Sequence, residues 1–137
     1  MSESTSAAEE RAIAYAQHLF DLARDGDAAA LRTALDAGVP VNLTNANGDT
    51  LLILAAYHRH GDVVRVLLDH GADVHRHNDR GQNALVSAVF QQDAPVVRML
   101  LDAGADPAAG TPSAVDTARA FGLPAMAELL EEHRPSP

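Results

Sequence analysis

The side chains best suited to chemistry in this 137-residue chain are its seven histidines. His75 and His77 lie two residues apart, and in an extended segment this spacing would place both rings on one face, as metal ligands often lie. A metal site needs three or four convergent donors, however, and neither a His-Glu-x-x-His pattern nor a cysteine accompanies the pair. We therefore expect no metal and no other cofactor, and we keep a histidine-based metal-binding protein as an alternative.

Other catalytic chemistries lack the residues that they need. All ten basic residues are arginines, which excludes a Schiff-base lysine and a phosphate-loop lysine, and without cysteine there is no thiol nucleophile. No serine lies in a Gly-x-Ser-x-Gly elbow, and the glycines form no phosphate-binding pattern. Asp73 and Asp106 lie in matching sequence contexts, which favours a structural role over a catalytic pair. The sequence predicts that the protein is not an enzyme.

Charge and hydropathy limit the possible partners and locations. The net charge of −9 disfavours binding to nucleic acid or to an anionic membrane. The polar, acidic segment 1–10 lacks the features of a signal peptide, and no apolar run approaches transmembrane length, so we expect a cytoplasmic protein. A composition rich in Ala, with Arg in place of Lys, is typical of bacteria with GC-rich genomes.

The positions of these residues follow an internal repeat. Residues 48–74 recur 33 residues later, which indicates one supersecondary unit that is repeated and stacked. The matching pairs are Gly48 and Gly81, Leu52 and Leu85, Ala55 and Ala88, Val63-Val64 and Val96-Val97, Leu67-Leu68 and Leu100-Leu101, and Gly71-Ala72-Asp73 and Gly104-Ala105-Asp106.

These residues resemble the ankyrin repeat, in which a turn with Gly is followed by a Thr-Pro-Leu-His-like helix start, Ala-Ala, Val-Val, Leu-Leu and Gly-Ala-Asp-Val. The segment Thr50-Leu51-Leu52-Ile53 departs from the family pattern because it lacks the Pro and the His. The resemblance covers roughly residues 12–133. It implies an all-α ankyrin-repeat solenoid of four helix-turn-helix units with β-hairpin-like finger loops. It also accounts for His60 and His70, since the family pattern often has His at these places.

The local sequence signals divide the chain accordingly. We expect a disordered segment over residues 1–6, a repeat domain over residues 7–133 and a disordered tail over residues 134–137. The four repeats span roughly 12–44, 45–77, 78–107 and 108–133, with helices near 7–24, 28–37, 50–58, 62–70, 83–91, 94–103, 113–121 and 124–132. The finger loops are residues 39–49, 72–82 and 105–112, and the third is three residues shorter than the repeat requires. In the last repeat Glu131 stands where Leu68 and Leu101 stood, which is typical of a terminal repeat.

The resemblance also implies a binding surface, because ankyrin repeats bind partner proteins through their finger tips and inner helices. Tyr57 and Phe90 occupy the same place in successive repeats, and large rings anchor many interfaces. Packing of these rings between repeats is the alternative. The matching positions in this chain are Asn45, Asn47, Asp49, Tyr57, His58, His77, Asp79, Arg80, Gln82, Phe90, Gln91 and Phe121.

The sequence therefore predicts a monomeric, non-enzymatic module that binds another protein through its concave face. Its acidic character favours a partner with a basic patch. A dedicated accessory or inhibitory subunit of one enzyme is a further alternative.

Overall fold

A computed structural model describes residues 2–133, and the side chains of residues 7–133. In this range the chain forms helices and no strands. The helices are α1 (Ser2–Asp25), α2 (Ala28–Asp36), α3 (Leu51–Tyr57), α4 (Gly61–Asp69), α5 (Ala84–Phe90), α6 (Ala94–Asp102), α7 (Ala114–Ala120) and α8 (Pro124–Glu132). None of these helices combines the length and the apolar character that crossing a membrane requires.

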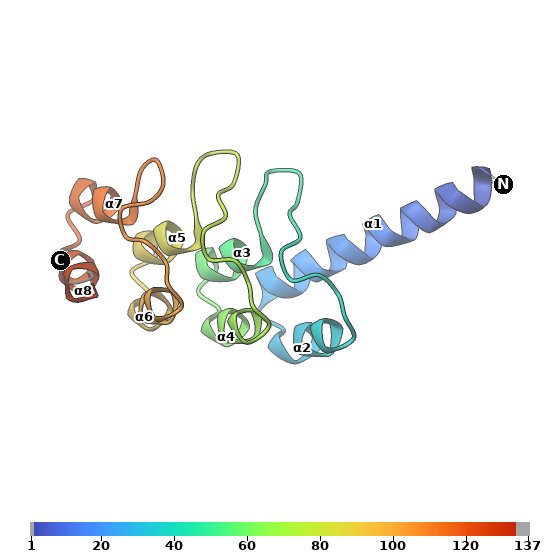
Figure 1. Ribbon diagram of the computed structural model, residues 1–137, viewed down its shortest axis with the longest axis horizontal. Coiled ribbons are helices and arrows are strands. Elements are labelled where there is room, and N and C mark those ends of the chain that lie inside the picture. Colours follow the sequence, from blue (N-terminus) through green and yellow to red (C-terminus); the bar gives the residue numbers. More distant parts are fainter. Residues whose placement is uncertain (1, 134–137) are drawn as a thin grey trace.

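The helices stack as antiparallel pairs in two rows (Figure 1). The inner row contains the C-terminal half of α1, followed by α3, α5 and α7, and the outer row contains α2, α4, α6 and α8. Each inner helix packs against its own outer helix and against the inner helices of the adjacent repeats. This is the solenoid that the sequence repeat predicts.

Polar caps fix where the inner helices start. The N-cap side chains of α3, α5 and α7 each accept a hydrogen bond from a first-turn backbone N–H, which would otherwise have no partner. The bonds are Ile53 N to Thr50 Oγ1 (3.0 Å), Val86 N to Asn83 Oδ1 (2.9 Å) and Asp116 N to Ser113 Oγ (3.1 Å). Three different capping residues thus start the inner helix in three repeats.

The core runs continuously through the stack because the inner helices are covered on nearly all sides. In α3 every residue from Leu51 to Ala56 is buried, whereas the outer helix α4 buries one stripe that includes Val63 and Leu67. Each outer helix in the first three pairs is followed by a glycine in the left-handed region, such as Gly71 at φ +80°, which ends the helix without a Cβ clash. Because the core covers the preceding residues of an inner helix, the last residue of that helix lies at the edge of the core.

The finger loops rise beside the inner row (Figure 1). Across the first two loops the backbone closes hairpin-like turns, with Asn45 N donating to Asp49 O at 3.0 Å and Asn78 N donating to Gln82 O at 2.8 Å. Asp79 N also donates to Asn47 O at 3.0 Å, which joins the two tips. The third loop, which has three residues fewer than the repeat requires, is also shorter in space (Figure 1).

The N-terminal part of the chain differs from the expectation. Helix α1 begins at Ser2, so residues 2–6 are helical instead of disordered. The packed end of α1 supplies the helix nucleus, and extension toward the N-terminus through Ala7, Ala8 and the following glutamates then needs little further stabilisation. Helical spacing places Ile13 on the apolar stripe of this helix, but its side chain is 58% exposed because this half of α1 projects past α2 (Figure 1). The expected disordered tail, residues 134–137, lies outside the described residues.

Candidate binding groove

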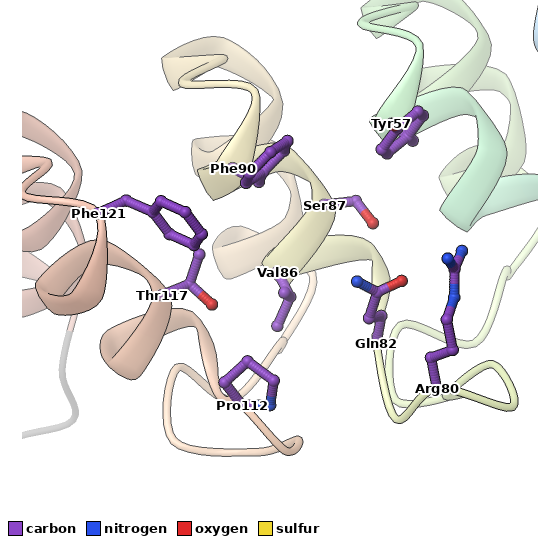
Figure 2. A pocket seen from close by; sticks show the side chains of 9 residues that line it. All are labelled: Tyr57, Arg80, Gln82, Val86, Ser87, Phe90, Pro112, Thr117 and Phe121. Carbon is purple, nitrogen blue, oxygen red and sulfur yellow. The ribbon is translucent and has the colours of Figure 1, made fainter.

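Two adjoining hollows lie between the inner helices and the second and third finger loops. The larger, which we call the aromatic hollow, has a volume of about 320 Å³, and the smaller, the polar hollow, about 170 Å³. The aromatic hollow is lined by Tyr57, Arg80, Gln82, Val86, Ser87, Phe90, Pro112, Thr117 and Phe121 (Figure 2). The polar hollow is lined by Asp49, Ile53, Leu54, Tyr57, His58, Asn78, Arg80, Gln82 and Ser87. Because they share four residues, the two hollows form one continuous groove.

Three aromatic rings stand along one side of the aromatic hollow (Figure 2). Tyr57 ends α3, Phe90 ends α5 and Phe121 caps the C-terminus of α7, and the exposed fractions of the three residues are 47%, 47% and 61%. Phe90 and Phe121 meet edge to face, with ring centroids 5.4 Å apart. The rings are therefore not buried between repeats; they form a surface that crosses three repeats.

Besides the hydroxyl of Tyr57, two side-chain hydroxyl groups line the aromatic hollow, and each already donates its proton within the protein. Ser87 Oγ donates to Asn83 O at 3.2 Å, and Thr117 Oγ1 donates to Ser113 O at 2.8 Å. Each hydroxyl has a single proton, so both oxygens face the hollow as acceptors. A ligand can donate to them but cannot accept from them.

Arg80 and Gln82 supply donors at the other end of the hollow. Gln82 Oε1 accepts from Asn78 Nδ2 at 3.2 Å, which leaves the Gln82 Nε2 amide as the free donor. Arg80 is exposed, and its guanidinium forms no ion pair or hydrogen bond with another residue in the described range. It is the single charged residue among those that line the aromatic hollow.

The polar hollow is built around a buried carboxylate. Asp49 is 7% exposed, and its Oδ1 accepts a hydrogen bond from Asn78 Nδ2 at 2.8 Å. His58 also lines this hollow, and burial lowers the pKa of His58, with Arg24 and His60 acting in the same direction. At neutral pH these shifts favour the uncharged imidazole.

The predicted site residues divide into two groups. The groove brings together Asp49, Tyr57, His58, Arg80, Gln82, Phe90 and Phe121. The other predicted residues, Asn45, Asn47, His77, Asp79 and Gln91, do not line either hollow. Two of these hold the loop: Asn45 Oδ1 accepts from the backbone N–H of Asn47 and Asp49, each at 3.0 Å, and Asn47 contributes the carbonyl that joins the finger tips.

Some groove residues were not singled out from the sequence. In the aromatic hollow these are Val86, Ser87, Pro112 and Thr117, and in the polar hollow Ile53, Leu54 and Asn78. Five of the seven precede a predicted ring by three or four residues, which is one turn of the same helix face. Helical spacing counted back from each ring would therefore have found them.

Three of the seven histidines, His60, His70 and His133, form hydrogen bonds through their rings. His60 Nε2 lies 2.8 Å from Arg24 O, and His70 Nε2 lies 2.7 Å from Asp36 Oδ1. The backbone at His75 turns, with its N–H donating to Asp73 Oδ1 at 2.8 Å, so His75 and His77 do not extend from a strand as the metal-site alternative assumed. Among the side chains that the structure describes, those of residues 7–133, no three His, Asp or Glu gather closely enough to hold a metal ion.

Comparison with known proteins agrees with the repeat and the geometry. A curated ankyrin repeat protein of Pseudomonas aeruginosa is 51% identical to this chain over 51 residues. The match covers 37% of this chain and 30% of that protein, so the chain spans about a third of the length of this relative. The family described as "Ankyrin repeats (3 copies)" matches residues 19–110. The chain therefore belongs to the ankyrin repeat family.

Proposed function

We propose that the chain binds a segment of another protein in the groove formed by the aromatic and polar hollows. Ankyrin repeats are generally protein–protein interaction modules and are generally non-enzymatic. The proposal places the binding surface of this member on the inner helices and finger loops. In this proposal the protein acts by binding its partner, and the proposed function includes no catalytic step.

The observation that carries the proposal is the row of exposed rings. In α3 and α5 every residue before the terminal ring is buried, yet Tyr57, Phe90 and Phe121 remain about half exposed or more. Aromatic side chains bury a large area at a small cost in conformational entropy, and they dominate the energetics of many interfaces. A rigid helical scaffold also holds the rings in place before binding, which lowers the entropy lost on association.

The first test is affinity capture from a native cell extract with the wild type and with Phe90→Ala/Phe121→Ala. We expect the wild type to retain a partner that the double variant loses by at least about tenfold, because the variant removes two anchors. The matched control is Arg65→Ala/Glu128→Ala, which changes two exposed residues on the outer helices. Circular dichroism checks that all three proteins are folded.

The outcomes separate the alternatives. Equal capture by the wild type and the ring variant would place the interface elsewhere and contradict the proposal. One captured enzyme in stoichiometric amount would favour a dedicated accessory or inhibitory subunit over a general adaptor. A monomeric state and a cytoplasmic location belong to the same proposal, and light scattering and cell fractionation check them.

A further inference from the structure

The charge of the groove differs from the charge of the whole chain. The chain has a net charge of −9, which led us to expect a partner with a basic patch. In the aromatic hollow, however, the charged residue is the cation Arg80, and no described residue neutralises it. In the polar hollow, the carboxylate of Asp49 is almost fully buried and already accepts a hydrogen bond from Asn78.

The charges near the groove matter more for a bound group than the net charge of the chain, because salt screens exposed charges beyond about 8 Å at physiological ionic strength. Acidic side chains of the outer helices are in part neutralised by neighbours: Asp36 contacts His70, Asp69 contacts Arg32, and Asp102 lies near His133. These contacts are on the outer row, whereas Arg80 lies on the finger loop beside the inner row (Figure 2). A group bound in the groove therefore meets the guanidinium of Arg80 first.

The free hydrogen-bonding groups of the hollow also favour an acidic group in the partner. Arg80 and Gln82 present N–H donors without acceptors, whereas Ser87 and Thr117 present acceptors because their protons bond within their own helices. A carboxylate is the group that best matches two neighbouring N–H donors, and the N–H groups of a peptide backbone match the two hydroxyl oxygens. The rings of Phe90 and Phe121 provide the apolar contact at the other end of the hollow (Figure 2).

From these contacts we propose that the groove binds an acidic and apolar peptide segment. An Asp or Glu side chain of the partner pairs with Arg80 and Gln82, and an apolar side chain of the same segment packs against the exposed faces of Phe90 and Phe121. The hollow, at about 320 Å³, holds side chains of a short segment and not a folded domain. This inference rests on the proposed function and adds the chemistry of the partner.

The test uses the full chain as bait for a display library of random dodecapeptides. We expect the selected peptides to share an Asp or Glu and a large apolar residue, and we expect Arg80→Glu to weaken the binding of a synthetic selected peptide by about tenfold or more, since it removes a charge-assisted pair. Replacing the acid of that peptide with Lys should restore binding to Arg80→Glu. The matched control is Arg76→Glu, which makes the same charge change on the same loop but outside both hollows.

Each result has a defined meaning. Peptides that need Phe90 and Phe121 but carry no shared acid, or that bind Arg80→Glu as tightly as the wild type, would overturn this inference and leave the proposed function standing. Peptides that bind Phe90→Ala/Phe121→Ala unchanged, or a library from which nothing is enriched over empty resin, would overturn both. An equal loss in Arg76→Glu and Arg80→Glu would also overturn the inference, because it would reduce the effect to net charge.

Discussion

Arg59 and Gln92 hold a backbone conformation that side chains rarely adopt. Their φ angles are +65° and +56°, and both occupy the short link between the inner and outer helix of a repeat. The equivalent residues in the first and last repeats are Gly26 and Gly122, which adopt positive φ without a Cβ clash. Two repeats thus carry local backbone strain that the other two avoid.

At this scale we predict that Arg59→Gly stabilises the protein by about 0.5–1 kcal/mol, because the relief of strain exceeds the added flexibility of the unfolded chain. Arg59 is exposed, and its side chain forms no hydrogen bond or ion pair with another described residue that would oppose the change. Urea denaturation followed by circular dichroism measures the difference. The same substitution at Arg65, exposed inside α4, should instead cost about 1 kcal/mol. A loss of stability in both variants would show that the link is not strained.

At the scale of the elements, His70 joins two outer helices. Its Nδ1 lies 2.9 Å from Val66 O in α4, and its Nε2 lies 2.7 Å from Asp36 Oδ1 in α2. Both ring nitrogens face acceptors, so both bonds form fully when the ring carries two protons. The hydrogen bond to the Val66 carbonyl raises the pKa of His70, with further help from Asp36, while Arg32 opposes the rise.

This contact makes the stability depend on pH. Because the pKa of His70 is raised on folding, its stabilising contribution is complete below the unfolded value of about 6.5 and is lost as the pH rises through the folded value. We predict that the Tm difference between wild type and His70→Asn is largest at pH 6 and shrinks at higher pH. Differential scanning calorimetry from pH 6 upward measures this Tm difference, with the exposed His77→Asn as control. A difference that does not change with pH would rule out the charged contact.

The elements were largely predictable from the sequence, whereas their ends and neighbours were less so. Helices α3 to α8 follow from apolar spacing and from caps such as Thr50 and Asn83, which act through local contacts. The start of α1 and the exposure of Ile13 depend on which other elements reach the N-terminal half of that helix. Spacing along one helix does not contain that information.

At the scale of the whole molecule, stability comes from contacts between adjacent repeats. Leu67 is fully buried in α4, whose neighbours in the outer row are α2 and α6. We predict that Leu67→Ala costs about 2–5 kcal/mol, since it leaves a cavity within the stack. Ile13→Ala, which truncates an exposed apolar side chain, should change stability by less than about 0.5 kcal/mol. Guanidinium denaturation compares the two, and similar losses would mean that α1 packs along its whole length.

The candidate site shows the same division between local and distant information. The repeat placed Tyr57 and Phe90 at equivalent positions, and the structure leaves both exposed at the groove. Asn45 and Asn47, predicted for binding, also hold the finger loop through hydrogen bonds, and their part in binding stays a prediction. The net charge suggested a basic partner, although the charge that lines the aromatic hollow belongs to Arg80. Neither the position of a single residue in the repeat nor the net charge of the chain reveals which side chains share a surface.

The location of Tyr57 also has a spectroscopic consequence. The chain contains no tryptophan and two tyrosines, so its ultraviolet fluorescence comes from Tyr15 and Tyr57. Tyr15, on α1, is exposed and lines neither hollow, whereas Tyr57 lines both, with its ring centroid 5.2 Å from that of His58. With Tyr15 changed to Phe, a single natural fluorophore remains, and it stands in the groove. Emission from that ring then reports directly on whether the groove is empty or covered, without a label or an added dye.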